Sequence, residues 1–136
     1  MKEKSFHAIN VTIPYKQTVI PYLDYISPQA KLIGAVNTIV NRDGKLYGYN
    51  TDFDGMMSLI KKNNIDVKNK KVLILGAGGT SKTARAVLTT LEAKEIIIVS
   101  IEDLPGIISY EDALKYHLDA KVIVNTTPCG MYPKNE

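Results

Sequence analysis

The stretch Lys71-Val-Leu-Ile-Leu-Gly-Ala-Gly-Gly-Thr-Ser-Lys82 decides the fold of the second half of the chain. It begins with a continuous apolar run from Val72 to Leu75, which is typical of a strand buried on both faces of a parallel sheet. Glycines follow directly, and apolar residues then recur at helical spacing. These helix residues are Ala84, Val87, Leu88 and Leu91. The stretch therefore predicts a strand, a tight turn and an amphipathic helix.

The same alternation continues beyond this stretch. Residues 95–99 and 121–125 are predicted to be a second and a third strand of this buried type, and Ser109 with Asp112 has the spacing of a helix cap between them. Strand, helix, strand, short helix, strand is the pattern of a parallel α/β nucleotide-binding domain. We therefore expect residues 67–136 to form part of a Rossmann-like domain.

The glycine-rich turn is the candidate phosphate site of this domain. Its bare backbone N–H groups can approach a pyrophosphate, and the field at the following helix N-terminus favours negative charge. The residues of the turn are Gly76, Ala77, Gly78, Gly79 and Thr80. The third fingerprint position is Ser81, a departure from glycine or alanine that is still small enough for close packing of helix on strand. Ser81 also stands where a P-loop needs glycine before Lys82, which disfavours an ATPase or kinase. The alternative is a tight turn without a ligand.

The first half of the chain has a different pattern, with shorter apolar runs and more turn and cap signals. The predicted elements are a strand over 6–13, a short helix over 14–23 broken at Pro21, a short helix from Ser27-Pro28 to Leu32, a hairpin of 35–41 and 45–49 around Asp43-Gly44, and a helix opening at 50–55 and ending at Asn63. Thr51 and Asp54 have capping-box spacing at the start of that last helix. We expect a boundary between two units near Ile65–Asn69.

Two charged residues in the first unit are candidates for chemistry. Lys16 follows Pro14 near the predicted start of a helix, where the positive end of the helix dipole disfavours a cation. Asp52 opens another helix, where an acidic residue is good capping chemistry and needs no catalytic role. Both residues follow strand-like runs, so both could lie on the rim of one sheet. Their spacing in the sequence does not show that they meet.

The composition argues against several classes of function. The 136 residues carry a net charge of +3, which is too small and too scattered to indicate nucleic acid or a membrane surface as partner. No apolar run is long enough to span a bilayer. The single cysteine, Cys129, rules out an internal disulfide framework and suits a reducing, cytoplasmic location. With two separated histidines and one cysteine, we expect no metal site.

Five segments, in this order, resemble the shikimate dehydrogenase family, and the resemblance extends over nearly the whole chain. The first three are specific, because generic dinucleotide-binding proteins do not carry them. The segments are Asn10-Val-Thr-Ile-Pro-Tyr-Lys16, Gly34-Ala-Val-Asn-Thr38, Asn50-Thr-Asp-Phe-Asp-Gly55, Gly76-Ala-Gly-Gly79 and Asn125-Thr-Thr-Pro-Cys-Gly-Met131.

This resemblance implies an NADP-dependent oxidoreductase that reversibly reduces 3-dehydroshikimate to shikimate in chorismate and aromatic amino acid biosynthesis. Residues 1–66 would be part of the substrate-binding (catalytic) domain, and residues 67–136 part of the NAD(P)-binding domain. The partner would be this small-molecule substrate.

The resemblance also implies roles for individual residues. Lys16 would be the catalytic lysine with Asp52 as its carboxylate partner, and Thr12, Asn37 and Asp52 would bind the substrate. Gly76, Ala77, Gly78, Gly79 and Thr80 would hold the pyrophosphate of the cofactor, and Thr126 and Thr127 would lie beside it.

The chain departs from the family pattern in three places. A Ser-x-Ser substrate motif does not precede Phe6, no helix with a substrate-contacting glutamine follows residue 131, and the connection after Ser100 is short. We therefore expect a fragment that lacks both ends, binds shikimate weakly and self-associates through open sheet edges. Glu102 and Asp103 could suit the ribose hydroxyls of NAD as an alternative cofactor. The alternative functions are a quinate/shikimate dehydrogenase relative and a nucleotide-binding module without turnover.

Overall fold

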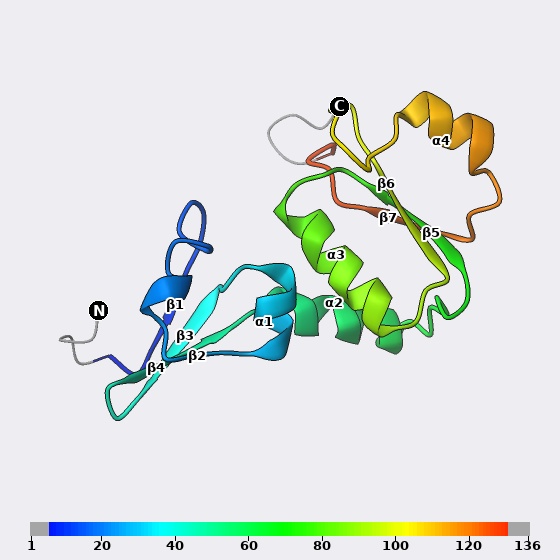
Figure 1. Ribbon diagram of the computed structural model, residues 1–136. Coiled ribbons are helices and arrows are strands. Elements are labelled where there is room, and N and C mark those ends of the chain that lie inside the picture. Colours follow the sequence, from blue (N-terminus) through cyan, green and yellow to red (C-terminus); the bar gives the residue numbers. More distant parts are fainter. Residues whose placement is uncertain (1–5, 131–136) are drawn as a thin grey trace. The chain divides into compact units, whose positions relative to one another are not determined.

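The computed structural model describes residues 6–130, and the chain divides into two compact units, Met1–Asn63 and Asn64–Glu136. Both units contain helices and strands (Figure 1). The predicted α/β class is therefore confirmed. None of the helices among these described residues is long and apolar enough to cross a membrane.

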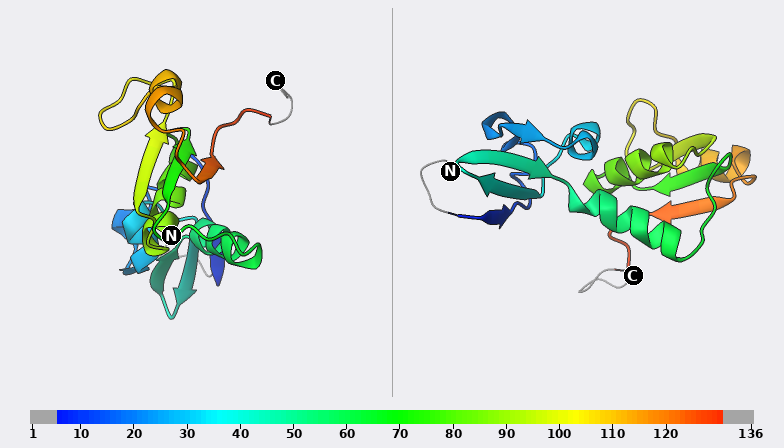
Figure 2. Two further views of the ribbon diagram at one scale, coloured as in Figure 1. Left: turned by 90° about the vertical axis from the view of Figure 1, so that its right-hand side faces the viewer. Right: turned by 90° about the horizontal axis from the view of Figure 1, so that it is seen from below.

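Among residues 6–63, the first unit is built on a four-stranded mixed sheet. In sheet order the strands are β1 (Ala8–Asn10), β3 (Thr38–Arg42), β4 (Lys45–Tyr49) and β2 (Tyr25–Ile26). The central β3–β4 hairpin turns at Asp43 and Gly44, whose φ angles of 51° and 81° suit this sharp reversal. β1 pairs with β3 in antiparallel orientation and β2 pairs with β4 in parallel orientation, so the hairpin lies between them (Figure 2).

The helices of this unit begin at side-chain caps. α1 (Pro28–Ile33) begins after Ser27, whose Oγ accepts a hydrogen bond from the N–H of Ala30 at 3.2 Å, as the Ser27-Pro28 signal predicted. α2 (Thr51–Lys62) is capped by Asn50. The predicted cap at Thr51 is wrong by one residue, because Thr51 is already helical and its N–H donates to the side chain of Asn37.

Two further predictions for the first unit need correction. The strand predicted over 6–13 is limited to Ala8–Asn10, and the helix predicted over 14–23 is a series of turns followed by the short 3₁₀ helix η1 (Ile20–Tyr22). A helix would use the carbonyl of Lys16 to accept the N–H of Ile20. Instead that carbonyl accepts the N–H of Val36 at 2.8 Å, and the N–H of Ile20 donates to Gln17.

The core of the first unit lies against its hairpin. Its fully buried residues are Ala30, Val36, Ile39 and Leu46, which come from α1, the segment before β3, and the hairpin itself. Partly buried side chains from β1 and from the turns that follow it pack around them, including Ile9, Val11 and Val19. Burial of these apolar groups therefore fixes the turn that carries Lys16 next to the hairpin.

Among residues 64–130, the second unit contains a parallel sheet of three strands, each within one residue of a predicted strand. They are, in sheet order, β6 (Glu95–Val99), β5 (Lys71–Leu75) and β7 (Val122–Asn125). Leu75 is aligned with Val99 on one side and with Asn125 on the other. The chain therefore places its second strand on one side of β5 and its third on the other. Such a reversal of strand order creates a crevice at the carboxyl ends of the strands.

Two helices cover this parallel sheet. α3 (Gly79–Thr90) packs on β5 and β6, and Ser81 in its first turn is only 2% exposed, as a small residue at the third fingerprint position predicted. α4 (Tyr110–Tyr116) is capped by Ser109, also as predicted, and buries Ala113 against Leu73 and Val99.

The connection after β6 is short and returns to the sheet. The N–H of Ile108 donates to the carbonyl of Ile98 at 3.0 Å, and Ile108 forms a parallel bridge with Val99. The segment from Ser100 to Ser109 therefore leads from β6 into α4 and contains no helix of its own.

β7 is more open than its apolar sequence predicted. Ile123 is 63% exposed, so a strand buried on both faces is wrong here. Among residues 6–130, β7 pairs only with β5, because it lies at the edge of the sheet. Self-association stays a prediction, and this open edge is the feature that favours it.

Candidate active site

Lys16 and Asp52 meet in the first unit. The Nζ of Lys16 lies 3.2 Å from Oδ2 of Asp52, and their side chains are 31% and 53% exposed. Lys16 comes from the turns after β1, and Asp52 from the first turn of α2. An ion pair this exposed contributes about 0.2–1 kcal/mol to stability. Stability therefore explains little of why the two groups are held together.

The backbone of Lys16 is held by the segment that leads into the β3–β4 hairpin. Its carbonyl accepts the N–H of Val36, and the next residue, Asn37, is joined through its own N–H to the carbonyl of Tyr49 at 3.0 Å. Because no helix begins at Pro14, the helix field predicted to act on Lys16 is absent. Asp52 is the charged group that the structure places beside it.

The side chain of Asn37 is buried and firmly oriented. It is 9% exposed, and its Oδ1 accepts from the N–H of Thr51 at 2.9 Å, the hydroxyl of Thr51 at 3.3 Å and the hydroxyl of Thr38 at 3.1 Å. A backbone N–H can bond only to the oxygen of the amide, so this network sets which way the amide points. The NH₂ group is left as the part of Asn37 that can donate to a ligand.

Thr12 is linked to the same network through the backbone. Its neighbour Val11 donates its N–H to the carbonyl of Asn37 at 2.8 Å, and the carbonyl of Thr12 accepts the N–H of Tyr15. The side chain of Thr12 is exposed. The structure thus links all four predicted residues of the first unit, Lys16, Asp52, Asn37 and Thr12.

Sequence reasoning gave no role in the site to the residues that orient Asn37. The capping-box spacing indicates only a helix cap at Thr51, although its N–H and hydroxyl both bond to Asn37. Thr38 directly follows Asn37 in the Gly34–Thr38 segment. This adjacency was the sequence signal that could have identified Thr38 as a partner of the Asn37 side chain. The hydrogen bond from Thr51 joins residues fourteen positions apart, and no local sequence pattern predicts such a bond.

The glycine-rich turn of the second unit approaches the end of β7. Gly76 has a φ of +99°, and a Cβ there would lie 2.9 Å from Oγ1 of Thr126 and 3.2 Å from Cγ2 of Thr127. The hydroxyl of Thr126 donates to the carbonyl of Leu75 at 2.7 Å. The structure therefore brings the predicted turn and the two predicted threonines together. Met131, the last residue of that quoted segment, lies outside the described residues.

The N-terminus of α3 differs from the other α-helix starts among residues 6–130. α1, α2 and α4 each have a side-chain oxygen that accepts from the first turn, whereas Gly78 at the cap of α3 offers none. The first-turn N–H groups of α3 thus lack a side-chain acceptor of this kind. Free N–H groups after a bare glycine turn suit a phosphate group.

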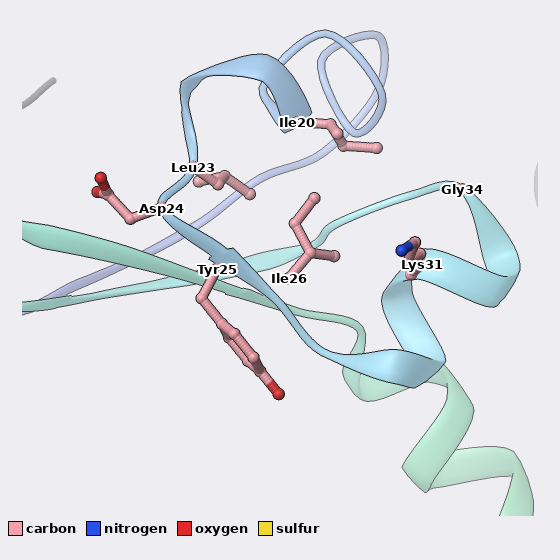
Figure 3. A pocket seen from close by; sticks show the side chains of 7 residues that line it. All are labelled: Ile20, Leu23, Asp24, Tyr25, Ile26, Lys31 and Gly34. Atoms are coloured by element: carbon pink, nitrogen blue, oxygen red, sulfur yellow. The ribbon is translucent and has the colours of Figure 1, made fainter.

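A pocket of about 540 Å³ also lies in the first unit, among η1, β2 and α1. Figure 3 shows Ile20, Leu23 and Ile26 around one space, with the amine of Lys31 at its other side. None of the predicted site residues lines it. Its walls are mainly apolar, so we place the candidate site at the polar Lys16–Asp52 network instead. Among residues 6–130, no group of three or more His, Cys, Asp or Glu could hold a metal ion.

These features define a class of α/β protein in which a lysine–carboxylate pair is carried by a turn and a helix next to a small mixed sheet, and a glycine turn follows a parallel strand. Residues 1–39 match the family model of the shikimate dehydrogenase substrate binding domain. The predicted resemblance to the shikimate dehydrogenase family is confirmed by this match and by the relatives described next.

The relatives agree in sequence and in fold. The shikimate dehydrogenase (NADP(+)) of Clostridium beijerinckii is 41% identical, over 93% of this chain and 49% of that protein. The crystal structure of shikimate dehydrogenase 1 from Peptoclostridium difficile is 42% identical, with a TM-score of 0.77 over 95% of this chain and 50% of that one.

A third relative carries ligands. The shikimate 5-dehydrogenase of Thermus thermophilus, solved in complex with NADP(H) and shikimate, is 30% identical, with a TM-score of 0.77 over 93% of this chain and 50% of that one. The chain thus spans about half the length of the relatives it matches.

Proposed function

We propose that this chain carries the catalytic pair and part of the cofactor site of a shikimate dehydrogenase, which reversibly reduces 3-dehydroshikimate to shikimate with NADP. The observation that carries the proposal is the contact between Lys16 and Asp52, 3.2 Å long, beside the oriented amide of Asn37. The names of the relatives, which are shikimate dehydrogenases (NADP(+)), support the choice of substrate and cofactor.

The side chains of the first unit suit such a substrate. Reduction of a ketone builds negative charge on its oxygen, which the Lys16 ammonium stabilises and protonates. Asp52 holds the ammonium in place through its contact with Nζ. A polyhydroxylated ring needs short hydrogen-bonding side chains around it, and Asn37, Thr12 and Asp52 are of this kind. Residues 1–66 are therefore proposed as part of the substrate-binding domain.

The second unit, proposed as part of the NAD(P)-binding domain over residues 67–136, has a fitting cradle for a dinucleotide. A Cβ at Gly76 would fill the space next to Thr126, and the start of α3 lacks a side-chain cap. Gly76 to Thr80 would hold the pyrophosphate, with Thr126 and Thr127 beside the cofactor. When bound, NADP supplies the hydride for the ketone carbon. NAD is the alternative cofactor, and the cytoplasm is the proposed location.

The test measures shikimate-dependent reduction of NADP by the purified full-length protein that carries this chain, together with the variants Lys16→Ala and Lys70→Ala. Lys70 is the matched control, because it also forms an ion pair with an exposed carboxylate, that of Asp66, but in the second unit. We expect Lys16→Ala to lower kcat by about 10²–10⁴-fold, the usual contribution of a general acid. Lys70→Ala should retain the unaltered rate.

Other outcomes distinguish the alternatives. Equal turnover by Lys16→Ala and the unaltered chain would remove Lys16 from the mechanism. Turnover of quinate without turnover of shikimate would favour the quinate dehydrogenase relative. Binding of NADP without turnover of either substrate would favour a nucleotide-binding module.

A further inference from the structure

Asn50 makes two hydrogen bonds that join different parts of the candidate site. Its Oδ1 accepts the backbone N–H of Asp52 at 3.1 Å, and its Nδ2 donates to the carbonyl of Ala35 at 3.0 Å. The residue is only 3% exposed. Burial strengthens both bonds, and loss of either would leave a buried polar group without its partner.

A helix cap alone does not require an asparagine. α1 and α4 of the same chain are capped by Ser27 and Ser109, each through a single hydroxyl oxygen that accepts from the first turn. A serine is about as favourable as asparagine at this position. What asparagine adds at residue 50 is the NH₂ group, and the structure uses it for the bond to Ala35.

That second bond leads to the backbone of Lys16. Ala35 is followed directly by Val36, whose N–H donates to the carbonyl of Lys16 at 2.8 Å. One end of Asn50 therefore fixes the backbone of Asp52, and the other fixes the segment that holds Lys16. The two charged side chains belong to elements 36 residues apart in sequence, and this buried amide spans the distance between their backbones.

We propose that Asn50 is a positioning residue, which sets the distance between the Lys16 ammonium and the Asp52 carboxylate through its bond to Ala35. The inference rests on the proposed function in so far as it takes Lys16 and Asp52 to be the catalytic pair. It adds that the helix cap and the tether are separate roles of one side chain, and that the pair depends on the tether.

The test separates the cap from the tether by substitution. Asn50→Ser retains a capping oxygen but cannot reach Ala35, whereas Asn50→Ala loses both bonds. Asn63→Ala is the matched control, since Nδ2 of Asn63 donates to the carbonyl of Leu59 at 2.8 Å at the other end of the same helix. Each protein is the full chain, labelled with ¹³C and ¹⁵N for NMR.

The readout is the nuclear Overhauser effect between the Hε protons of Lys16 and the Hβ protons of Asp52. We expect it in the unaltered chain and in Asn63→Ala, and we expect its loss in Asn50→Ser while amide exchange in α2 stays protected. A general structural defect would instead expose the helix to exchange. If Asn50→Ala does not fold, Asn50→Ser alone decides, because its helix remains capped. Retention of the effect in Asn50→Ser would overturn the proposal.

Turnover provides a second, independent measurement. With an active chain, Asn50→Ser should lower kcat for shikimate at least tenfold with a smaller change in KM, and Asn63→Ala should not. A kcat for Asn50→Ser equal to that of Asn63→Ala would contradict the positioning role. Absence of turnover in the unaltered full-length protein would count against the proposed function alone, and the NMR comparison would still decide the role of Asn50.

Discussion

The backbone carbonyl of Lys16 accepts a hydrogen bond from the N–H of Val36 at 2.8 Å. This bond takes the acceptor that a helix starting at Pro14 would need for its own ladder. Lys16 is therefore presented on a turn that is fixed to the segment before β3. The Lys16 side chain reaches Asp52 on α2, although the two residues belong to different elements.

The orientation of the Asn37 amide predicts which half of it a ligand uses. Three donors already occupy Oδ1, so Asn37→Asp keeps an acceptor for Thr51 but removes the NH₂ group. We expect KM for shikimate to rise roughly tenfold, the effect of one lost hydrogen bond of about 1.4 kcal/mol, with the fold retained. Steady-state kinetics and circular dichroism measure the two quantities.

Asn41→Asp is the matched control for this prediction. Oδ1 of Asn41 accepts the N–H of Gly44 at 2.9 Å in the hairpin turn, which an aspartate can also do. Its KM should stay unchanged. A KM for Asn37→Asp that equals the control value would show that the NH₂ group does not bind substrate.

Gly76 is predicted to tolerate no side chain. An alanine at residue 76 would be strained by the φ of +99°, and its Cβ would lie only 2.9 Å from Oγ1 of Thr126. Gly76→Ala should therefore lower the free energy of unfolding by about 1–3 kcal/mol. Gly55→Ala is the control, because a Cβ in α2 meets nothing within 4 Å, and we expect a gain of about 0.5–1 kcal/mol. Urea titration gives both values, and equal stability of the two variants would count against a strained turn.

The ion pairs of Lys71 predict a pH dependence of the second unit. Nζ of Lys71 lies 2.9 Å from Asp119 and 3.4 Å from Glu95, at the amino ends of the strands. The hydrogen bond to Lys71 lowers the pKa of Asp119 from its ordinary value of 3.8, and the bond to Asp119 raises the pKa of Lys71 above 10.5. Because its pKa is lowered in the folded state, the Asp119 carboxylate stabilises the fold above pH 3.8. This stabilisation is lost as the pH falls through the pKa of the folded state.

Lys71 sets the upper pH limit of this stabilisation. Because its pKa is raised in the folded state, Lys71 stabilises the fold below pH 10.5, and the effect disappears as the pH rises through the pKa of the folded state. We therefore expect Lys71→Gln to reduce Tm most between these limits, and less in strong acid or in high salt. Thermal melts across pH test this, with Lys94→Gln as a control at an exposed lysine outside the ion pairs of Lys71. A Tm difference for Lys71→Gln that is independent of pH would contradict the assignment.

Local sequence predicted the second unit better than the first, for a physical reason. The run from Val72 to Leu75 forms β5 because its burial is dictated by its own composition. The start of α2 was misplaced by one residue, since Asn50 and Thr51 are both good caps. The choice depends on Asn37, which takes the N–H of Thr51 from a distant part of the chain.

The candidate site was predictable as a set of residues but not as an arrangement. The resemblance to known motifs selected Lys16, Asp52 and Asn37, whereas spacing could not show that the first two meet. Their contact depends on bonds to Val36 and Ala35, which join segments far apart in sequence. For the same reason the exposure of Ile123 could not be predicted, because it depends on what neighbours β7 in the folded sheet.

The most direct test of the central claim is a double-mutant cycle on kcat for shikimate oxidation, with Lys16→Ala, Asp52→Asn and the double variant. If the two side chains act as one unit, each single change removes most of the rate, and the double variant is no slower than Lys16→Ala. Factors that multiply in the double variant would show that Lys16 and Asp52 act independently, and would contradict the account.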